Sequence, residues 1–119
     1  MSEAKTYSGS CHCGKVAYKV ELDLSHVITC NCSICSRTGS VMAFVPEAHF
    51  ELLSGKDSLT DYQFKTKTVH HVFCTTCGVR SFAHGTDRKG AAMYMVNARC
   101  LEGVDLKALT ITEHDGRSA

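Results

Sequence analysis

The sequence predicts a single, mainly β domain of short antiparallel strands that is held together by bound zinc. Three observations support this prediction. The chain has 119 residues, which is enough for one compact domain and too few for two ordinary ones. Short runs of branched and aromatic residues alternate with turn signals along the chain. Eight cysteines are present, and most lie in tight clusters whose spacing suits a metal ion.

Composition and charge exclude several classes of protein. The chain is 44% hydrophobic and 21% charged, as expected of a folded protein. Its net charge is +1 and it has no long basic run, so we expect no nucleic-acid partner. The longest apolar stretches, residues 41–45 and 91–96, are far shorter than the roughly 20 residues of a membrane helix. No targeting segment is visible at the first residues, and we expect a cytoplasmic protein without a membrane partner.

Predicted strands are short and separated by turn signals such as Pro46-Glu47-Ala48 and Glu102-Gly103. The first has an alternating pattern bounded by Gly14 and Asp23. Only one helix is expected, about one turn running from just after Cys32 through Ser36. The strands are expected at residues 15–22, 27–30, 41–45, 50–53, 59–64, 68–73, 81–83, 91–98 and 109–112.

Cysteine spacing favours metal binding over disulfide bonds. All cysteines except Cys100 lie within three residues of another cysteine, and a bridge across one intervening residue closes a strained ring. Zinc takes thiolates in a tetrahedron, and sulfurs one or two residues apart can reach one ion from a tight turn. Gly14 and Gly78 each follow such a pair, and glycine allows the backbone conformation that the turn needs.

Pairing the two glycine-flanked segments predicts a closed, structural zinc site that joins distant parts of the chain. Structural zinc sites contribute on the order of 10 kcal/mol to folding, a large amount for a domain of this size. An iron–sulfur centre or a redox disulfide is the alternative at these positions. The four predicted ligands are Cys11, Cys13, Cys74 and Cys77.

The remaining cluster, Cys30, Cys32 and Cys35, has three thiols and no obvious fourth ligand. Three protein ligands are typical of a zinc that keeps one position open for chemistry, so we predict a second zinc and a catalytic role here. A redox thiol pair, or a metal closed by a histidine or by Cys100, is the alternative. A lone cysteine such as Cys100 is most often a small buried apolar residue, and we assign it no chemistry.

Two residues are candidate substrate-binding groups. Strand alternation places His70 on the face shared by Val72 and Cys74, toward the metal. Arg37 follows Cys35 by two residues, where its charge can pair with an anionic substrate. A hydrogen-bonded or solvated role is the alternative for each residue.

The motifs GSCHCGKV at residues 9–16, CNCSIC at 30–35 with Gly39 following, and FCTTCG at 73–78 cover much of the chain. The match extends to YQF at 62–64 and VNARCL at 96–101. Together they resemble the glutathione-dependent formaldehyde-activating enzyme family, which also includes centromere protein V. The resemblance implies an Mss4-like β-tent with a structural zinc on the first four cysteines and a second zinc on the other three. It also implies a carbon–sulfur lyase that interconverts formaldehyde and glutathione with S-hydroxymethylglutathione.

We therefore predict a zinc-dependent carbon–sulfur lyase that acts on an adduct of glutathione or a similar thiol. A zinc with three thiolates carries a formal charge of −1, so it is a weaker Lewis acid than a zinc with three neutral histidines but is well suited to accept a further soft sulfur ligand. Two other classes of function remain open: a non-catalytic zinc-binding interaction module, and a thiol redox or metal sensor.

Overall fold

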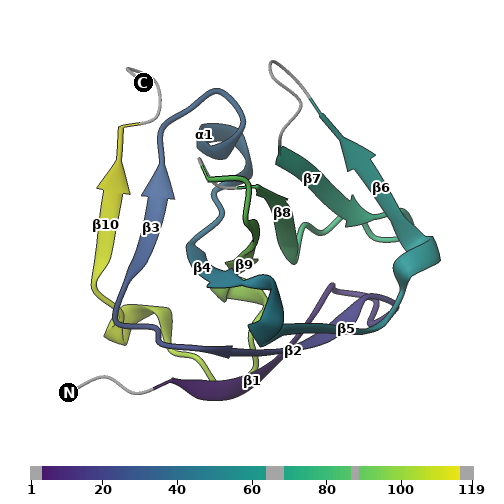
Figure 1. Ribbon diagram of the computed structural model, residues 1–119, viewed down its shortest axis with the longest axis horizontal. Coiled ribbons are helices and arrows are strands. Elements are labelled where there is room, and N and C mark those ends of the chain that lie inside the picture. Colours follow the sequence, from purple (N-terminus) through teal and green to yellow (C-terminus); the bar gives the residue numbers. More distant parts are fainter. Residues whose placement is uncertain (1–3, 64–68, 87–88, 116–119) are drawn as a thin grey trace.

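The computed structural model describes residues 4–63, 69–86 and 89–115, and its strands form two sheets (Figure 1). The smaller sheet has the order β1 (Lys5–Ser10), β2 (Ala17–Leu22) and β5 (Phe50–Ser54). The larger sheet has the order β10 (Ile111–His114), β3 (Val27–Cys30), β4 (Met42–Pro46), β9 (Ala92–Asn97), β8 (Phe82–Thr86), β7 (Val69–Cys74) and β6 (Leu59–Tyr62). The mainly β fold predicted from the sequence is confirmed.

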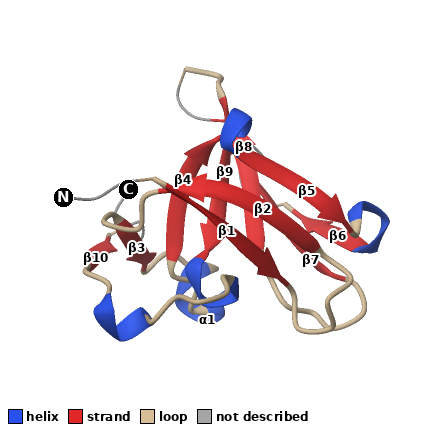
Figure 2. Ribbon diagram, turned by 90° about the horizontal axis from the view of Figure 1, so that it is seen from below, coloured by secondary structure: helices blue, strands red, loops and turns tan. Residues whose placement is uncertain are grey.

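The two sheets enclose the core in the manner of a tent. In Figure 1 the three-stranded sheet lies along the bottom, and the seven-stranded sheet rises above it from β10 and β3 on the left to β7 and β6 on the right. Figure 2 shows β1, β2 and β5 crossing over β4, β9 and β8. The short helix α1 (Cys35–Thr38) lies near the top of Figure 1, between β3 and β7 in that view.

Burial follows the alternation of the strand residues. In β2, Tyr18, Val20 and Leu22 are buried, while the intervening Lys19 and Glu21 are exposed. This pattern is expected of a strand that covers a core on one face. The side-chain faces of this strand therefore follow from the sequence.

An aromatic cluster joins the two sheets. Phe50 of β5 stacks on Tyr94 of β9, with ring centroids 4.1 Å apart, and also contacts Phe82 of β8 at 4.8 Å. The ring of Tyr18 is fully buried, and its hydroxyl donates a hydrogen bond to the carbonyl oxygen of Ser81 at 2.8 Å. Buried aromatic pairs add stability beyond the area they remove from water.

Several predicted boundaries differ from those in the structure. The helix α1 begins later than predicted and ends at Thr38. The strand β8 extends to Thr86, beyond the predicted end at residue 83. The strand β10 lies two residues later than predicted, and residues 64 and 68 of two predicted strands lie outside the described residues. The other strands lie within two residues of the predicted positions.

The sequence predicts no strand where the structure has β1. It also predicts only antiparallel pairing. The segment Lys5–Ser10 has few apolar side chains, and it forms a strand because it pairs along its whole length with β2. The strand β10 pairs with β3 in parallel, while the other neighbouring pairs among the described strands are antiparallel. A parallel pair requires a long connection, which here is most of the chain.

Short 3-10 helices occupy several of the predicted turns. They are η1 (Glu47–His49), η2 (Lys56–Ser58), η3 (Ala98–Cys100) and η4 (Leu106–Ala108). Within the part of the chain that the structure describes, no helix has the length and apolar character needed to cross a membrane.

The packing of Tyr18 against Gly9 gives a testable prediction. A Cβ atom at position 9 would lie 2.5 Å from the Tyr18 ring, which is buried and held by its hydrogen bond to Ser81. We expect Gly9→Ala to lower the free energy of unfolding by about 1–3 kcal/mol, as overpacking does elsewhere. Urea unfolding measures this change. Ser8→Ala, at the exposed neighbouring position, is the control, and an unchanged midpoint for Gly9→Ala would show that Tyr18 can move aside.

Candidate metal centres

The four-cysteine cluster joins two turns that are distant in the sequence. Cys11 and Cys13 lie between β1 and β2, and Cys74 and Cys77 lie at the end of β7 and in the turn after it. The Sγ atom of Cys13 is 3.6 Å from those of Cys11 and Cys74, and all four sulfurs lie within 4.8 Å of one another. A tetrahedral zinc with bonds of about 2.3 Å separates its sulfurs by about 3.8 Å. The cluster is therefore compatible with one zinc ion.

Each turn of this cluster is closed at a glycine. Gly14 and Gly78 have φ angles of +84° and +78°, a backbone conformation that residues with a Cβ atom rarely adopt. Their N–H groups donate to the carbonyl oxygens of Cys11 at 3.3 Å and Cys74 at 2.7 Å. The role predicted for these glycines is confirmed.

Backbone N–H groups point at the sulfurs and favour the thiolate form that a metal requires. Hydrogen bonds from the N–H groups of Cys13 and Val79 lower the pKa of Cys77 to about 6. The N–H group of Cys77 likewise lowers the pKa of Cys74. The N–H group of Val16 donates to the sulfur of Cys11 at 3.4 Å.

The three-cysteine cluster comes from one short stretch of chain. Cys30 ends β3, Cys32 lies in the following loop, and Cys35 begins α1. Their sulfurs lie within 4.8 Å of one another. Among the described residues, no histidine, aspartate, glutamate or further cysteine joins them as a fourth ligand. The cluster is compatible with a zinc bound by three protein ligands.

Cys100 is placed away from the three-cysteine cluster. It is half-buried, and its thiol donates to the carbonyl oxygen of Arg80 at 3.9 Å. Burial, together with the nearby Cys11 and Cys77, raises its pKa to about 11. Cys100 is therefore a neutral, partly buried thiol beside the four-cysteine cluster.

Ionisation is unequal within the three-cysteine cluster. Burial opposes ionisation of Cys32, but hydrogen bonds from the N–H group of Cys35 at 3.4 Å and from the neighbouring thiols outweigh it and lower its pKa. Burial and the adjacent Cys32 raise the pKa of Cys35 to about 12. Cys32 therefore ionises more readily than Cys35.

A groove runs beside the three-cysteine cluster. Ser33 and Ile34, between the second and third cysteines, line it together with Arg37 and Tyr62, and its volume is about 430 Å³. The Nη1 atom of Arg37 donates to the carbonyl oxygen of Ser33 at 2.6 Å, which holds the arginine at this groove. The structure thus brings Arg37 to the cluster as a candidate contact for a bound molecule.

The predicted contact His70 lies on the face of β7 opposite to the one that meets the groove. Its Nδ1 atom is 2.6 Å from Asp61 Oδ2, and its ring stacks on His84 with centroids 4.6 Å apart. The next residue, His71, is the strand partner of Tyr62, which lines the groove. Side chains alternate along a strand, so His71 rather than His70 shares a face with the groove.

Sequence reasoning did not single out Arg80 and Asn97. The Nη2 atom of Arg80 is 2.8 Å from Nδ1 of His71, and the side-chain amide of Asn97 donates to the carbonyl oxygen of Arg80 at 3.0 Å. The only signal for Arg80 is a basic residue that follows the second cysteine pair and precedes a strand.

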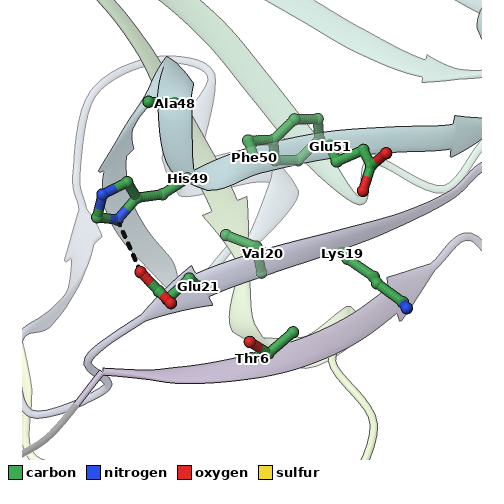
Figure 3. A pocket seen from close by; sticks show the side chains of 8 residues that line it. All are labelled: Thr6, Lys19, Val20, Glu21, Ala48, His49, Phe50 and Glu51. Atoms are coloured by element: carbon green, nitrogen blue, oxygen red, sulfur yellow. Dashed lines mark ion pairs between the residues drawn. The ribbon is translucent and has the colours of Figure 1, made fainter.

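A separate hollow lies over the three-stranded sheet (Figure 3). Its side chains include Lys19, Glu21 and Glu51, and His49 forms an ion pair with Glu21 at 3.6 Å. No cysteine lines this hollow, so it is not part of either metal-binding cluster.

The fold and the two clusters define a mainly β domain with two cysteine-based sites that are compatible with zinc. A family model described as glutathione-dependent formaldehyde-activating enzyme matches residues 6–113, so the chain belongs to this family and has its Mss4-like fold. The structure is also similar to the crystal structure of a Rhodobacter sphaeroides protein from structural genomics, with a TM-score of 0.76 and 36% sequence identity. That match covers 88% of this chain and 99% of the other.

The four-cysteine cluster gives a testable prediction about zinc and stability. We expect Cys74→Ser to lose the zinc of the four-cysteine cluster and to unfold or aggregate, because structural zinc contributes folding free energy directly. Cys100→Ser, at a cysteine outside both clusters, is the matched control and should keep its metal content and melting temperature. Native mass spectrometry and thermal unfolding measure both properties. A soluble Cys74→Ser variant with an unchanged melting curve would contradict a structural role.

The environment of His71 predicts a depressed pKa. Burial, and next the charge of Arg80, lower the pKa of His71 below its usual 6.5. Since arginine only donates, Nδ1 of His71 accepts the hydrogen bond and the ring is neutral. The stability contributed by this neutral ring is present above pH 6.5 and is lost as the pH falls through the lower, folded-state pKa. NMR titration of the ring protons checks the prediction, and titration at or above pH 6.5 would contradict it.

Proposed function

We propose that this protein is a zinc-dependent carbon–sulfur lyase that acts on an adduct of glutathione or a similar thiol, such as S-hydroxymethylglutathione. The observation that carries the proposal is the groove of about 430 Å³ beside a cluster with three thiol ligands. Three ligands leave one position of a tetrahedral zinc for a further group. Family membership supports the choice of glutathione and formaldehyde as reactants.

Zinc held by the three-cysteine cluster would take the substrate sulfur as its fourth ligand and lower the pKa of the thiol. In the condensing direction, a bond forms between the thiol sulfur and the carbon of formaldehyde, and the thiol proton is transferred to the aldehyde oxygen. The lyase direction reverses both changes. No oxidant or reductant is needed, which agrees with the redox-inert character of zinc.

The residues of the groove bind and orient the thiol. Arg37 presents a fixed positive charge beside the cluster, and glutathione carries carboxylates that an arginine can bind. Tyr62 supplies a half-exposed aromatic surface to the groove that Ile34 also lines. A bound thiol is thereby held next to the reacting aldehyde, and this proximity contributes to the rate. A contact from His70 remains a prediction, since its described partners are Asp61 and His84.

A cytoplasmic location is part of the proposal. Thiols are kept reduced in that compartment, where both the cysteine clusters and a glutathione substrate remain available.

The decisive experiment combines native mass spectrometry with an exchange assay. Zinc-loaded protein should carry two zinc ions per chain and form a glutathione complex, and it should accelerate exchange between ¹³C-formaldehyde and S-hydroxymethylglutathione as measured by NMR. Cys32→Ser should keep the fold, retain one zinc, and lose both the complex and the acceleration, because it removes a ligand of the second site only. Cys100→Ser is the control and should resemble the unchanged protein.

Two results would overturn the proposal. Exchange that persists in Cys32→Ser would separate the activity from the three-cysteine cluster. One zinc per chain with no glutathione complex would leave only the structural site, as expected of a non-catalytic interaction module.

A further inference from the structure

Arg80 is a cation, and only some of the nitrogens of its guanidinium group have hydrogen-bond partners. Its Nη2 atom is hydrogen-bonded to His71, but its Nε and Nη1 atoms are buried and have no hydrogen-bond partner. Among the described residues, no carboxylate forms an ion pair with it. A buried charge is costly unless an opposite charge faces it, so a negative group is expected beside these two nitrogens.

The backbone of Arg80 is fixed by Asn97. The amide of Asn97 donates to the carbonyl oxygen of Arg80 at 3.0 Å, while its own side-chain oxygen accepts from the N–H groups of Val41 at 3.4 Å and Arg99 at 3.1 Å. These bonds tie Arg80 to the segment that follows α1. Arg80 also lines a cavity of about 280 Å³ together with Thr38 and Ser40, which continue the chain from the three-cysteine cluster.

The negative charges that act on Arg80 are those of Cys35 and Cys32 in that cluster. Burial lowers the pKa of Arg80, whereas the charges of Cys35 and Cys32 raise it. The effect is reciprocal, because Arg80 in turn lowers the pKa of Cys35 against the stronger effect of burial. His71, the other group facing the guanidinium, is an acceptor and neutral.

We propose that Arg80 is the internal counter-ion of the three-cysteine cluster: its buried Nε–H and Nη1–H groups face the thiolates, and its charge gives the site a preference for an anionic sulfur as the next ligand. Arg80 is thus a positioning residue that acts through the cysteines. His71 holds the guanidinium from the opposite side by accepting its Nη2–H bond.

The preference follows from formal charge. Three thiolates and a divalent metal carry a formal charge of −1, which repels a further thiolate. The positive charge of Arg80 brings this set to zero, so an anionic sulfur is no longer repelled, while a neutral ligand is little affected. This inference rests on the proposed function, in which a substrate thiol becomes that next ligand.

The test uses the full chain loaded with Co²⁺, whose visible absorption reports ligands at the metal. The protein is titrated separately with 2-mercaptoethanol, a thiol without a carboxylate, and with imidazole, a neutral ligand. We expect Arg80→Gln to weaken binding of the thiol by about 10-fold or more, in the range reported for groups that support metal ligands, and to change imidazole binding by less than about twofold. Arg80→Lys, which keeps the charge, should lie between Arg80→Gln and the unchanged protein.

Arg99→Gln is the matched control. Arg99 is a nearby exposed arginine whose Nε atom donates to the carbonyl oxygen of Gly39 at 3.2 Å, and its replacement should leave the preference for the thiol intact. The inference is overturned if Arg80→Gln leaves thiol binding unchanged, or weakens thiol and imidazole binding equally.

A second measurement covers the case in which Arg80→Gln does not fold. In the unchanged protein loaded with ¹¹³Cd at both clusters, an N–H···S bond should give a scalar coupling between the Arg80 Nε–H proton and the metal. Its absence would overturn the inference. A Co²⁺-loaded protein that binds no thiol would contradict both this inference and the proposed function. Thiol binding with the same affinity in Arg80→Gln and in the unchanged protein would contradict this inference alone.

Discussion

The convergence of four sulfurs on one point is the constraint on which the rest of the structure depends. Cys11 and Cys13 belong to the connection between β1 and β2, and Cys74 and Cys77 to the end of β7 and the turn after it. Cys11 and Cys74 are themselves buried in the core. The cluster therefore joins the two sheets at one end, while the Tyr18 hydroxyl bonds them through Ser81. For a domain of this size, a zinc ion bound there would supply stability that the apolar core alone provides poorly.

This tie also places residues for the second cluster. The chain leaving Cys77 reaches Arg80 after a tight turn at Gly78, and Asn97 fixes the backbone there. Cys100 donates to the carbonyl oxygen of Arg80, and Arg80 lines a cavity with Thr38 and Ser40, which follow the three-cysteine cluster in the chain. In the proposal made above, the four-cysteine cluster thus helps to set the position of the charge beside the three-cysteine cluster.

The two clusters differ in how their ligands are supplied. The four-cysteine cluster takes its sulfurs from two distant segments, so metal loss there releases a long-range connection. The three-cysteine cluster takes its sulfurs from the single stretch between the end of β3 and the start of α1. Metal exchange or ligand binding at this second cluster can therefore occur without separating the sheets. This difference is the physical basis for assigning stability to one cluster and chemistry to the other.

The sequence by itself determined the mainly β fold, the two cysteine clusters that are compatible with zinc, and the glycines that close the turns of the four-cysteine cluster, because short-range spacing and alternation encode these features. It did not determine β1, whose residues form a strand only through pairing with β2, or the parallel pairing of β10 with β3. Only the tertiary structure decided that Arg80 is hydrogen-bonded to His71, which is the strand partner of Tyr62 in the groove beside the three-cysteine cluster. The physical reason is that this placement depends on which face of a strand meets a distant segment, and that relation is absent from local sequence.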